Sequence, residues 1–147
     1  MNNLKTIHLM TLLDDIDNES NLDEFLSNNL TSNSNMELYK YFEEIFKEKK
    51  LKKSNVIKNA HIDRTYGYEI LRGNKKPSRD KILQLCLGAG FTLEETNKAL
   101  KLGNCGELYP KIRRDSIIIF GLNKNLDVFN INELLYKYEL NLLGEEL

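Results

Sequence analysis

Apolar residues recur every three to four positions along most of the chain, and no segment alternates as a half-buried strand would. The clearest apolar stripe lies within residues 36–49 and consists of Leu38, Tyr41, Phe42, Ile45 and Phe46. A stripe with this spacing occupies one face of a helix. The pattern therefore predicts an all-α protein.

Three further helices are predicted after this stripe, each opened by a residue that favours the N-cap: Ser54, Asp63 and Ser78. Their expected inner faces are, in order, Val56, Ile57 and Ala60; Ile62, Tyr66 and Ile70; and Ile82, Leu83, Leu85 and Cys86. Gly73 is expected to end the second of them. Two short helices, a tight corner and a Gly-Lys-Pro turn over residues 51–78 form the layout of a helix-turn-helix unit.

The chain divides into three parts on composition. Residues 1–35 are an acidic arm that ends in a polar linker at 31–35, with one short helix predicted over 21–26 from Leu22, Phe25 and Leu26. Residues 36–106 hold the helix-turn-helix unit. Residues 107–147 are predicted to form a C-terminal helical hairpin that packs on the same core.

An ungapped repeat with a period of 35 residues links the last two parts. The identical pairs are Arg79/Arg114, Asp80/Asp115, Ile82/Ile117, Leu87/Leu122, Asn97/Asn132 and Leu100/Leu135. Each copy is predicted to be a helical hairpin, although two copies can also arise by coincidence. The equivalent positions of Arg79 and Arg114, each followed by aspartate, favour a structural role at the helix start over a contact with DNA.

Charge is distributed unevenly although the net charge is only −1. Residues 1–35 carry one lysine against six acidic residues, and residues 91–147 carry seven basic against nine acidic residues. Residues 36–90 carry thirteen basic against seven acidic residues. A basic block suits a partner such as nucleic acid, but clustering of charge on solvated helix faces produces the same count.

Several classes of protein are disfavoured by the sequence. No apolar stretch approaches the roughly 18 residues of a membrane span, and the N-terminus lacks a signal-peptide pattern. Cys86 and Cys105 are too few for a disulfide framework or a zinc site, and His8 and His61 suggest no metal site. No catalytic constellation, phosphate loop, cofactor motif or small-molecule site is recognised. We therefore expect a cytoplasmic protein that is not an enzyme and needs no cofactor.

The stretch from about residue 36 to 93 resembles the lambda-repressor-like, Cro/C1-type (XRE family) helix-turn-helix domains of bacteria and phages. The matching features are Ser54 before an apolar helix, the helix start Asp63-Arg64-Thr65, the turn Gly73-Asn74-Lys75-Lys76-Pro77-Ser78, and Leu83 followed by Gly90-Phe91-Thr92-Leu93. The turn looks like the family's recurrent Gly-x-x-x-Pro-Ser. The resemblance implies a recognition helix at about residues 63–71 that enters the major groove.

The resemblance also implies which residues meet DNA. The outer face of the recognition helix would read bases through Arg64, Thr65, Tyr68 and Glu69. Tyr68 would serve either a base edge or a phosphate. Phosphates would be held by Lys52, Lys53, Ser54, Arg72, Lys75 and Lys76. Ordinary solvated ion pairs and solubilising lysines are the alternative interpretation of these charges.

Two residues depart from the family pattern. His61 stands at the corner where the family usually has glycine, whose left-handed backbone carries little cost. Gly67 stands within the recognition helix where a core aliphatic residue is usual, at a cost of about 1 kcal/mol relative to alanine. Gly67 indicates either close packing against another element or a helix that has drifted away from reading DNA.

Two functions remain open on the sequence. The first is a sequence-specific DNA-binding transcriptional regulator that binds double-stranded DNA as a homodimer through its C-terminal helices, whose apolar residues Leu134, Leu135, Tyr138 and Leu142 exceed one inner face. The second is a protein-interaction module that retains the helix-turn-helix fold without binding DNA. In a hybrid of the two, the acidic arm masks the basic face until a partner removes it.

Overall fold

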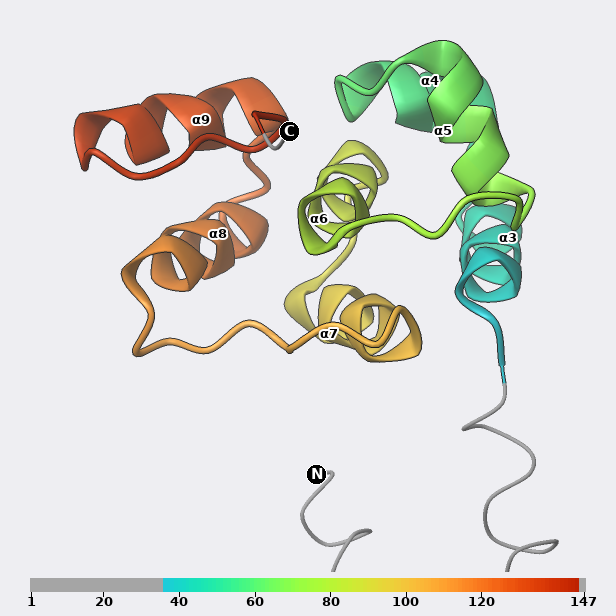
Figure 1. Ribbon diagram of the computed structural model, residues 1–147, viewed down its shortest axis with the longest axis horizontal. Coiled ribbons are helices and arrows are strands. Elements are labelled where there is room, and N and C mark those ends of the chain that lie inside the picture. Colours follow the sequence, from blue (N-terminus) through green and yellow to red (C-terminus); the bar gives the residue numbers. More distant parts are fainter. Residues whose placement is uncertain (1–35, 146–147) are drawn as a thin grey trace, which may run out of the picture. The chain divides into compact units, whose positions relative to one another are not determined.

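The computed structural model describes residues 36–145 of the 147-residue chain, and seven helices and no strand lie within them (Figure 1). The helices are α3 (Leu38–Glu48), α4 (Lys53–Asn59), α5 (Arg64–Leu71), α6 (Arg79–Gly88), α7 (Leu93–Leu102), α8 (Arg113–Asn123) and α9 (Val128–Lys137). The predicted all-α class is thus confirmed. The helix expected over 21–26 and the linker at 31–35 lie outside the described residues.

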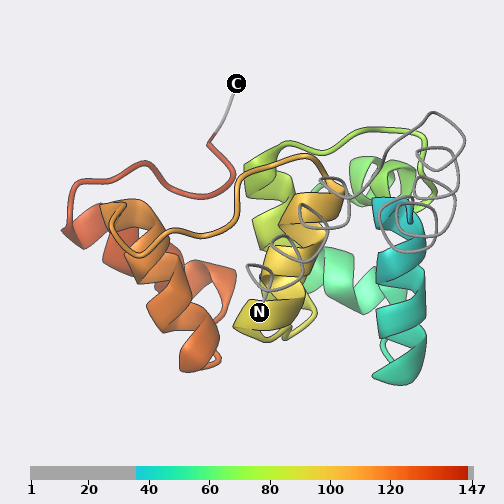
Figure 2. The same ribbon diagram turned by 90° about the horizontal axis from the view of Figure 1, so that it is seen from below.

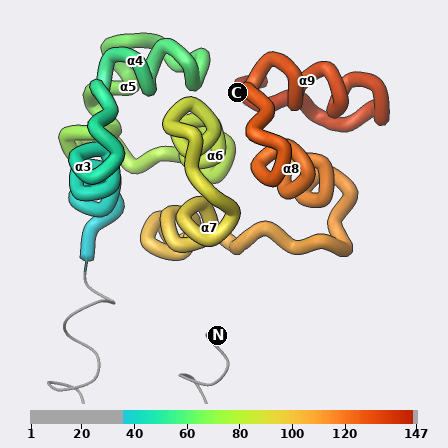
Figure 3. The backbone as a smooth tube through the Cα atoms, turned by 180° about the vertical axis from the view of Figure 1, so that it is seen from behind, coloured from blue at the N-terminus to red at the C-terminus, as the bar shows by residue number. Residues whose placement is uncertain are grey.

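Helix α6 occupies the centre of this part of the chain. It packs against α4, α7 and α9, and its residues 82–87 are all buried. Figures 1 and 2 show α6 and α7 between α3–α5 on one side and α8–α9 on the other, and the view from behind in Figure 3 agrees. One apolar core therefore runs through both sequence repeats.

The first predicted stripe lies against α7 and the turn before it. The ring of Phe42 is 5.8 Å from that of Phe91 between centroids, and Phe46 is 6.2 Å from it. The hydroxyl of Tyr41 donates to the carbonyl oxygen of Glu95 at 3.1 Å. Of the five stripe residues only Ile45 is half-buried, because it lies at the edge of the inward face.

Two of the three predicted N-caps are confirmed. The side chains of Asp63 and Ser78 accept from the backbone N–H three residues on, at 3.1 and 3.3 Å. The prediction for Ser54 was wrong, because α4 begins at Lys53 and Ser54 lies inside it. The extended residue at the N-cap is Lys52, which has no side-chain acceptor.

The 35-residue repeat is also a structural repeat. Helices α7 and α9 are 35 residues apart at both ends. The side-chain oxygen of Asn97 accepts from the N–H of Leu108 at 2.9 Å, and that of Asn132 accepts from the N–H of Leu143 at 2.8 Å. In each copy one asparagine thus fixes the strap that follows its hairpin.

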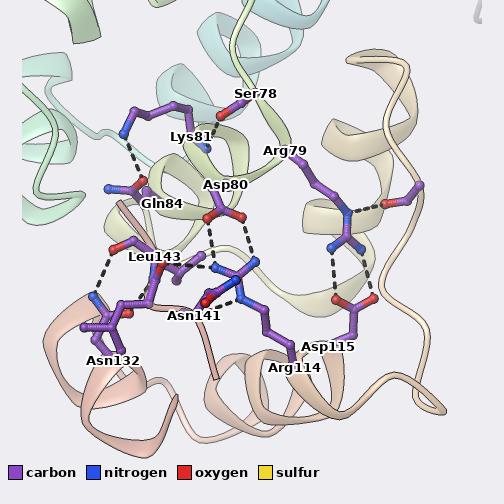
Figure 4. A network of polar contacts seen from close by, with 12 residues as sticks. Ser78, Arg79, Asp80, Lys81, Gln84, Arg114, Asp115, Asn132, Asn141 and Leu143 are labelled. Atoms are coloured by element: carbon purple, nitrogen blue, oxygen red, sulfur yellow. Dashed lines mark hydrogen bonds and ion pairs between the residues drawn. The ribbon is translucent and has the colours of Figure 1, made fainter. Parts of the chain in front are cut away.

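Two reciprocal ion pairs join the copies (Figure 4). Arg79 donates two hydrogen bonds to the carboxylate of Asp115, both at 2.9 Å. Arg114 donates two to the carboxylate of Asp80, both at 2.8 Å. Each guanidinium also donates to two backbone carbonyls of the strap in its own copy. The predicted structural role of both arginines is therefore confirmed.

Candidate nucleic-acid interface

Helix α5 exposes one continuous polar face. Arg64 and Thr65 are exposed, while Tyr68 and Glu69 are half-buried. These four predicted base-reading residues lie on one side of the helix, since residues three and four apart share a face. The opposite side carries Gly67, Ile70 and Leu71, all buried.

The inward face of α5 differs from the sequence prediction at one position. Tyr66 was predicted to point into the core with Ile62 and Ile70, but it is only half-buried. At 3.6 residues per turn the inward arc centres on Gly67 and Ile70, which leaves Tyr66 at its edge. A core prediction based on a period of four therefore placed the tyrosine one residue away from the true contact.

Close packing explains the glycine within α5. A Cβ atom at Gly67 would lie 2.7 Å from Cγ2 of Ile57 on α4. Any larger residue would push the two helices apart, because Ile57 is only 2 % exposed and is held by its neighbours. Gly67 thus fixes how closely α5 approaches α4, which agrees with the first of the two interpretations of this glycine.

Gly67→Ala is expected to lower the free energy of unfolding by about 1 kcal/mol. Overpacking a core costs about 2 kcal/mol, while alanine gains about 1 kcal/mol over glycine in a helix. Urea denaturation followed by circular dichroism measures the difference. Gly106→Ala is the control, because a Cβ there meets nothing within 4 Å. A Gly67→Ala protein as stable as the wild type would contradict the packing argument.

The corner before α5 has the backbone that the glycine-based family pattern implies. His61 has φ of 59°, in the left-handed region. Its N–H donates to the carbonyl of Lys58, and the next N–H, of Ile62, donates to the carbonyl of Ile57. A histidine therefore adopts the conformation usually left to glycine, at a modest energetic cost.

Two arginines stack on one tyrosine along the outer face of α5. The guanidinium carbon of Arg64 lies 5.8 Å from the ring centroid of Tyr68, and that of Arg72 lies 5.3 Å from it. Cation–π contacts at this distance favour particular positions of the guanidinium while its N–H donors stay available. The ring of Tyr68 thus contacts one guanidinium four residues before it and another four residues after it. Sequence reasoning missed it, although the spacing of 64, 68 and 72 at i, i+4 and i+8 carries the signal.

Lysines flank the stack at two places in the sequence. Lys52 and half-buried Lys53 begin α4, and exposed Lys75 and Lys76 lie in the turn between α5 and α6. Within residues 36–145 none of the four forms an ion pair, so their charges are left to solvent. Exposed Ser54 follows the first pair, within the first turn of α4.

A packed aromatic ring supports the turn that carries Lys75 and Lys76. The carbonyl of Glu69 accepts from the N–H groups of Asn74 and Lys75, at 2.9 and 3.3 Å. Gly73 has φ of 83°, and a Cβ there would lie 2.7 Å from Cδ1 of Tyr39. The ring of Tyr39 on α3 thus packs directly against the turn, a role that no pattern in the sequence indicates.

Metal sites and membrane-spanning helices were also sought among the described residues. Among the described residues, no group of three or more His, Cys, Asp or Glu side chains is placed to hold a metal ion. None of the described helices has the length and apolar character needed to cross a membrane. In comparisons with family models, curated proteins and solved structures, the chain matches none of them.

Proposed function

We propose that this protein is a sequence-specific DNA-binding transcriptional regulator of the helix-turn-helix type, with α5 as the helix that enters the major groove. The observation that carries the proposal is the Arg64–Tyr68–Arg72 stack on the exposed face of α5. Guanidinium groups are the commonest specific partners of guanine, through its O6 and N7 atoms. A short helix with prepositioned guanidiniums on its solvent side suits a major-groove reader.

The charges around the stack support the same function. Lys52, Lys53, Lys75 and Lys76 lie before and after α5 in the chain and have no acidic partner in the described region. Phosphate contacts from such lysines set the register of a protein on DNA, while base contacts supply specificity. Arg64, Thr65 and Glu69 are the proposed base readers, and Tyr68 positions the two arginines.

A salt series of fluorescence anisotropy on random-sequence duplex DNA tests this function. The full chain is expected to bind, with an affinity that falls linearly in a double-logarithmic plot against salt. Lys75→Ala/Lys76→Ala is expected to reduce the magnitude of the slope by about 1.8, because each phosphate contact contributes about 0.9. The control is Lys101→Ala/Lys124→Ala, which removes the same charge from exposed positions on α7 and after α8.

Equal slopes for the two double variants would show that binding comes from net charge alone and would overturn the assigned surface. No binding by the full chain at about 50 mM salt would overturn the function itself. The interaction module without DNA binding would then be the better description, with the groove described below as its surface.

A further inference from the structure

Helices α8 and α9 leave an apolar groove open on the surface. Its volume is about 420 Å³, and it is lined by Pro110, Lys111, Arg113, Ser116, Ile117, Phe120, Leu134 and Tyr138. Phe120 is 50 % exposed and Tyr138 is 45 % exposed. Large apolar side chains that gather at one exposed groove indicate a surface that binds another chain.

The structural repeat indicates what kind of element covers such a surface. A shift of 35 residues relates Ile117 and Tyr138 of the groove to Ile82 and Gly103 of the first copy. A Cβ at Gly103 would lie 2.5 Å from Cδ1 of Ile82 and 3.4 Å from Cδ2 of Leu38. In the first copy, this surface is therefore covered by α3.

One equivalent pair of residues differs in exposure between the two copies. Leu85 of the first copy is 0 % exposed, whereas its counterpart Phe120 is 50 % exposed. Figures 1 and 3 show α3 beside α6 and α7, with no described helix in the matching place beside α8 and α9. An amphipathic helix like α3 is thus the element that the groove lacks.

A second segment of the chain has the apolar spacing of α3. The buried residues of α3 are Leu38, Tyr41, Phe42 and Phe46. The same spacing recurs sixteen positions earlier in the sequence, at Leu22, Phe25, Leu26 and Leu30. Residues 22–30 thus have the apolar spacing of the helix that packs on the first copy of the repeat.

Charge favours the same segment. The groove is lined by two cationic residues, Lys111 and Arg113, and by no acidic one. Residues 1–35 carry six acidic residues against one lysine, and all six acids precede Leu26. In the first copy, Tyr39 near the N-terminal end of α3 lies against Gly73, whose counterpart is Leu108. A helix laid in the groove in the direction of α3 would therefore bring its N-terminal, acidic end toward the segment that carries Lys111 and Arg113.

We propose that the groove binds residues 22–30 of a second copy of this chain, so that two copies form a reciprocal homodimer. The choice of a second copy rests on the proposed function, because one short recognition helix gives too small an interface for operator-level affinity and such proteins pair on two half-sites. A reciprocal exchange buries both grooves and closes the assembly at two copies.

The test is complementation between two full-length variants, followed by sedimentation velocity. Phe25→Glu places a charge on the apolar face of residues 22–30, and Phe120→Glu places one in the groove. Each variant alone is expected to self-associate at least ~30-fold more weakly than the wild type. In an equimolar mixture, the intact groove of the first variant meets the intact segment of the second. A heterodimer is therefore expected, detected by energy transfer between dyes placed on the two variants.

Phe129→Glu is the matched control, because Phe129 is 58 % exposed on α9 and does not line the groove. It is expected to dimerise as the wild type does, and circular dichroism checks that all three variants are folded. A wild type that stays monomeric, a Phe25→Glu protein that still dimerises, or a mixture that forms no heterodimer would each overturn the proposal. No DNA is present in this assay, so its failure leaves the salt-series result untouched.

Discussion

Asp115→Ala is expected to lower the free energy of unfolding by about 3 kcal/mol, the low end of the range for breaking a buried ion pair. The carboxylate accepts two hydrogen bonds from Arg79 and a third from the N–H of Tyr109 at 2.9 Å. Its side chain is 2 % exposed, whereas that of Arg79 is 30 % exposed. Removal of Asp115 leaves this guanidinium with only two backbone carbonyls as acceptors and leaves the N–H of Tyr109 with none, and water reaches the arginine only in part.

Urea denaturation of Asp115→Ala beside Asp80→Ala measures this loss. Asp80 makes the equivalent pair with Arg114, but among the described residues it accepts no third hydrogen bond like the one from the N–H of Tyr109 to Asp115. The Asp80 variant is therefore expected to lose less stability. Equal losses would mean that the hydrogen bond from Tyr109 adds nothing to the contribution of Asp115.

The same carboxylate gives the protein a defined response to acid. Burial would raise the pKa of Asp115, but hydrogen bonds from Arg79 and from the N–H of Tyr109 outweigh it and lower the pKa below its usual value. Since the folded pKa lies below the unfolded pKa, Asp115 adds stability above the unfolded value of about 4. That contribution is lost as pH falls through the folded pKa. Asp115→Asn is expected to show a shallower loss of stability below about pH 4 than the wild type.

How the repeat units meet shows where sequence reasoning stops. The recurrence of Arg-Asp at the start of both helices predicted a structural role for the arginines. It could not predict that each arginine pairs with the aspartate of the other copy, since Arg79 reaches 36 residues forward and Arg114 reaches 34 back. That exchange depends on the orientation of the two hairpins, which is set by packing between them and leaves no local pattern.

Local chemistry explains the outcome for the caps. Asp63 and Ser78 occupy the N-cap positions directly before α5 and α6, so their position before an apolar run was sufficient to predict them. The prediction for Ser54 was wrong because the turn after α3 sets where the next helix begins. Lys50 lies in the left-handed region and the N–H of Leu51 donates to the carbonyl of Phe46, so the next extended residue is Lys52. The boundary of α4 is thus fixed by the preceding turn.

A buried polar contact also escaped prediction. Gln84 is 1 % exposed and donates from Nε2 to the carbonyl of Ala60 at 3.0 Å. This bond satisfies a carbonyl at the end of α4, which a helix leaves open. The sequence around a glutamine in an apolar helix does not show whether its side chain faces solvent or the end of another helix. Only the packing of α4 on α6 decides this for Gln84.

Arg64→Ala is expected to weaken binding to the preferred DNA site by about 1–3 kcal/mol, or roughly 5- to 150-fold, and to relax the preference at one base pair. The preferred site is first selected from a random library with the full chain. Arg64 is exposed at the start of α5, and its guanidinium stacks on Tyr68 with its donors free for guanine. Binding to random-sequence DNA is expected to fall far less, because phosphate contacts dominate it.

Two variants separate base reading from simple charge. Arg64→Lys keeps the charge but loses the planar fork that bonds O6 and N7 together, so it is expected to behave like the alanine variant on the selected site. Lys75→Ala is expected to weaken selected and random DNA by similar factors, since a phosphate contact carries no sequence information. If Arg64→Ala also lowers the affinity for selected and random DNA by equal factors, Arg64 contacts the DNA phosphates and not a base. Base reading must then pass to Thr65 and Glu69, the remaining polar side chains on the outer face of α5.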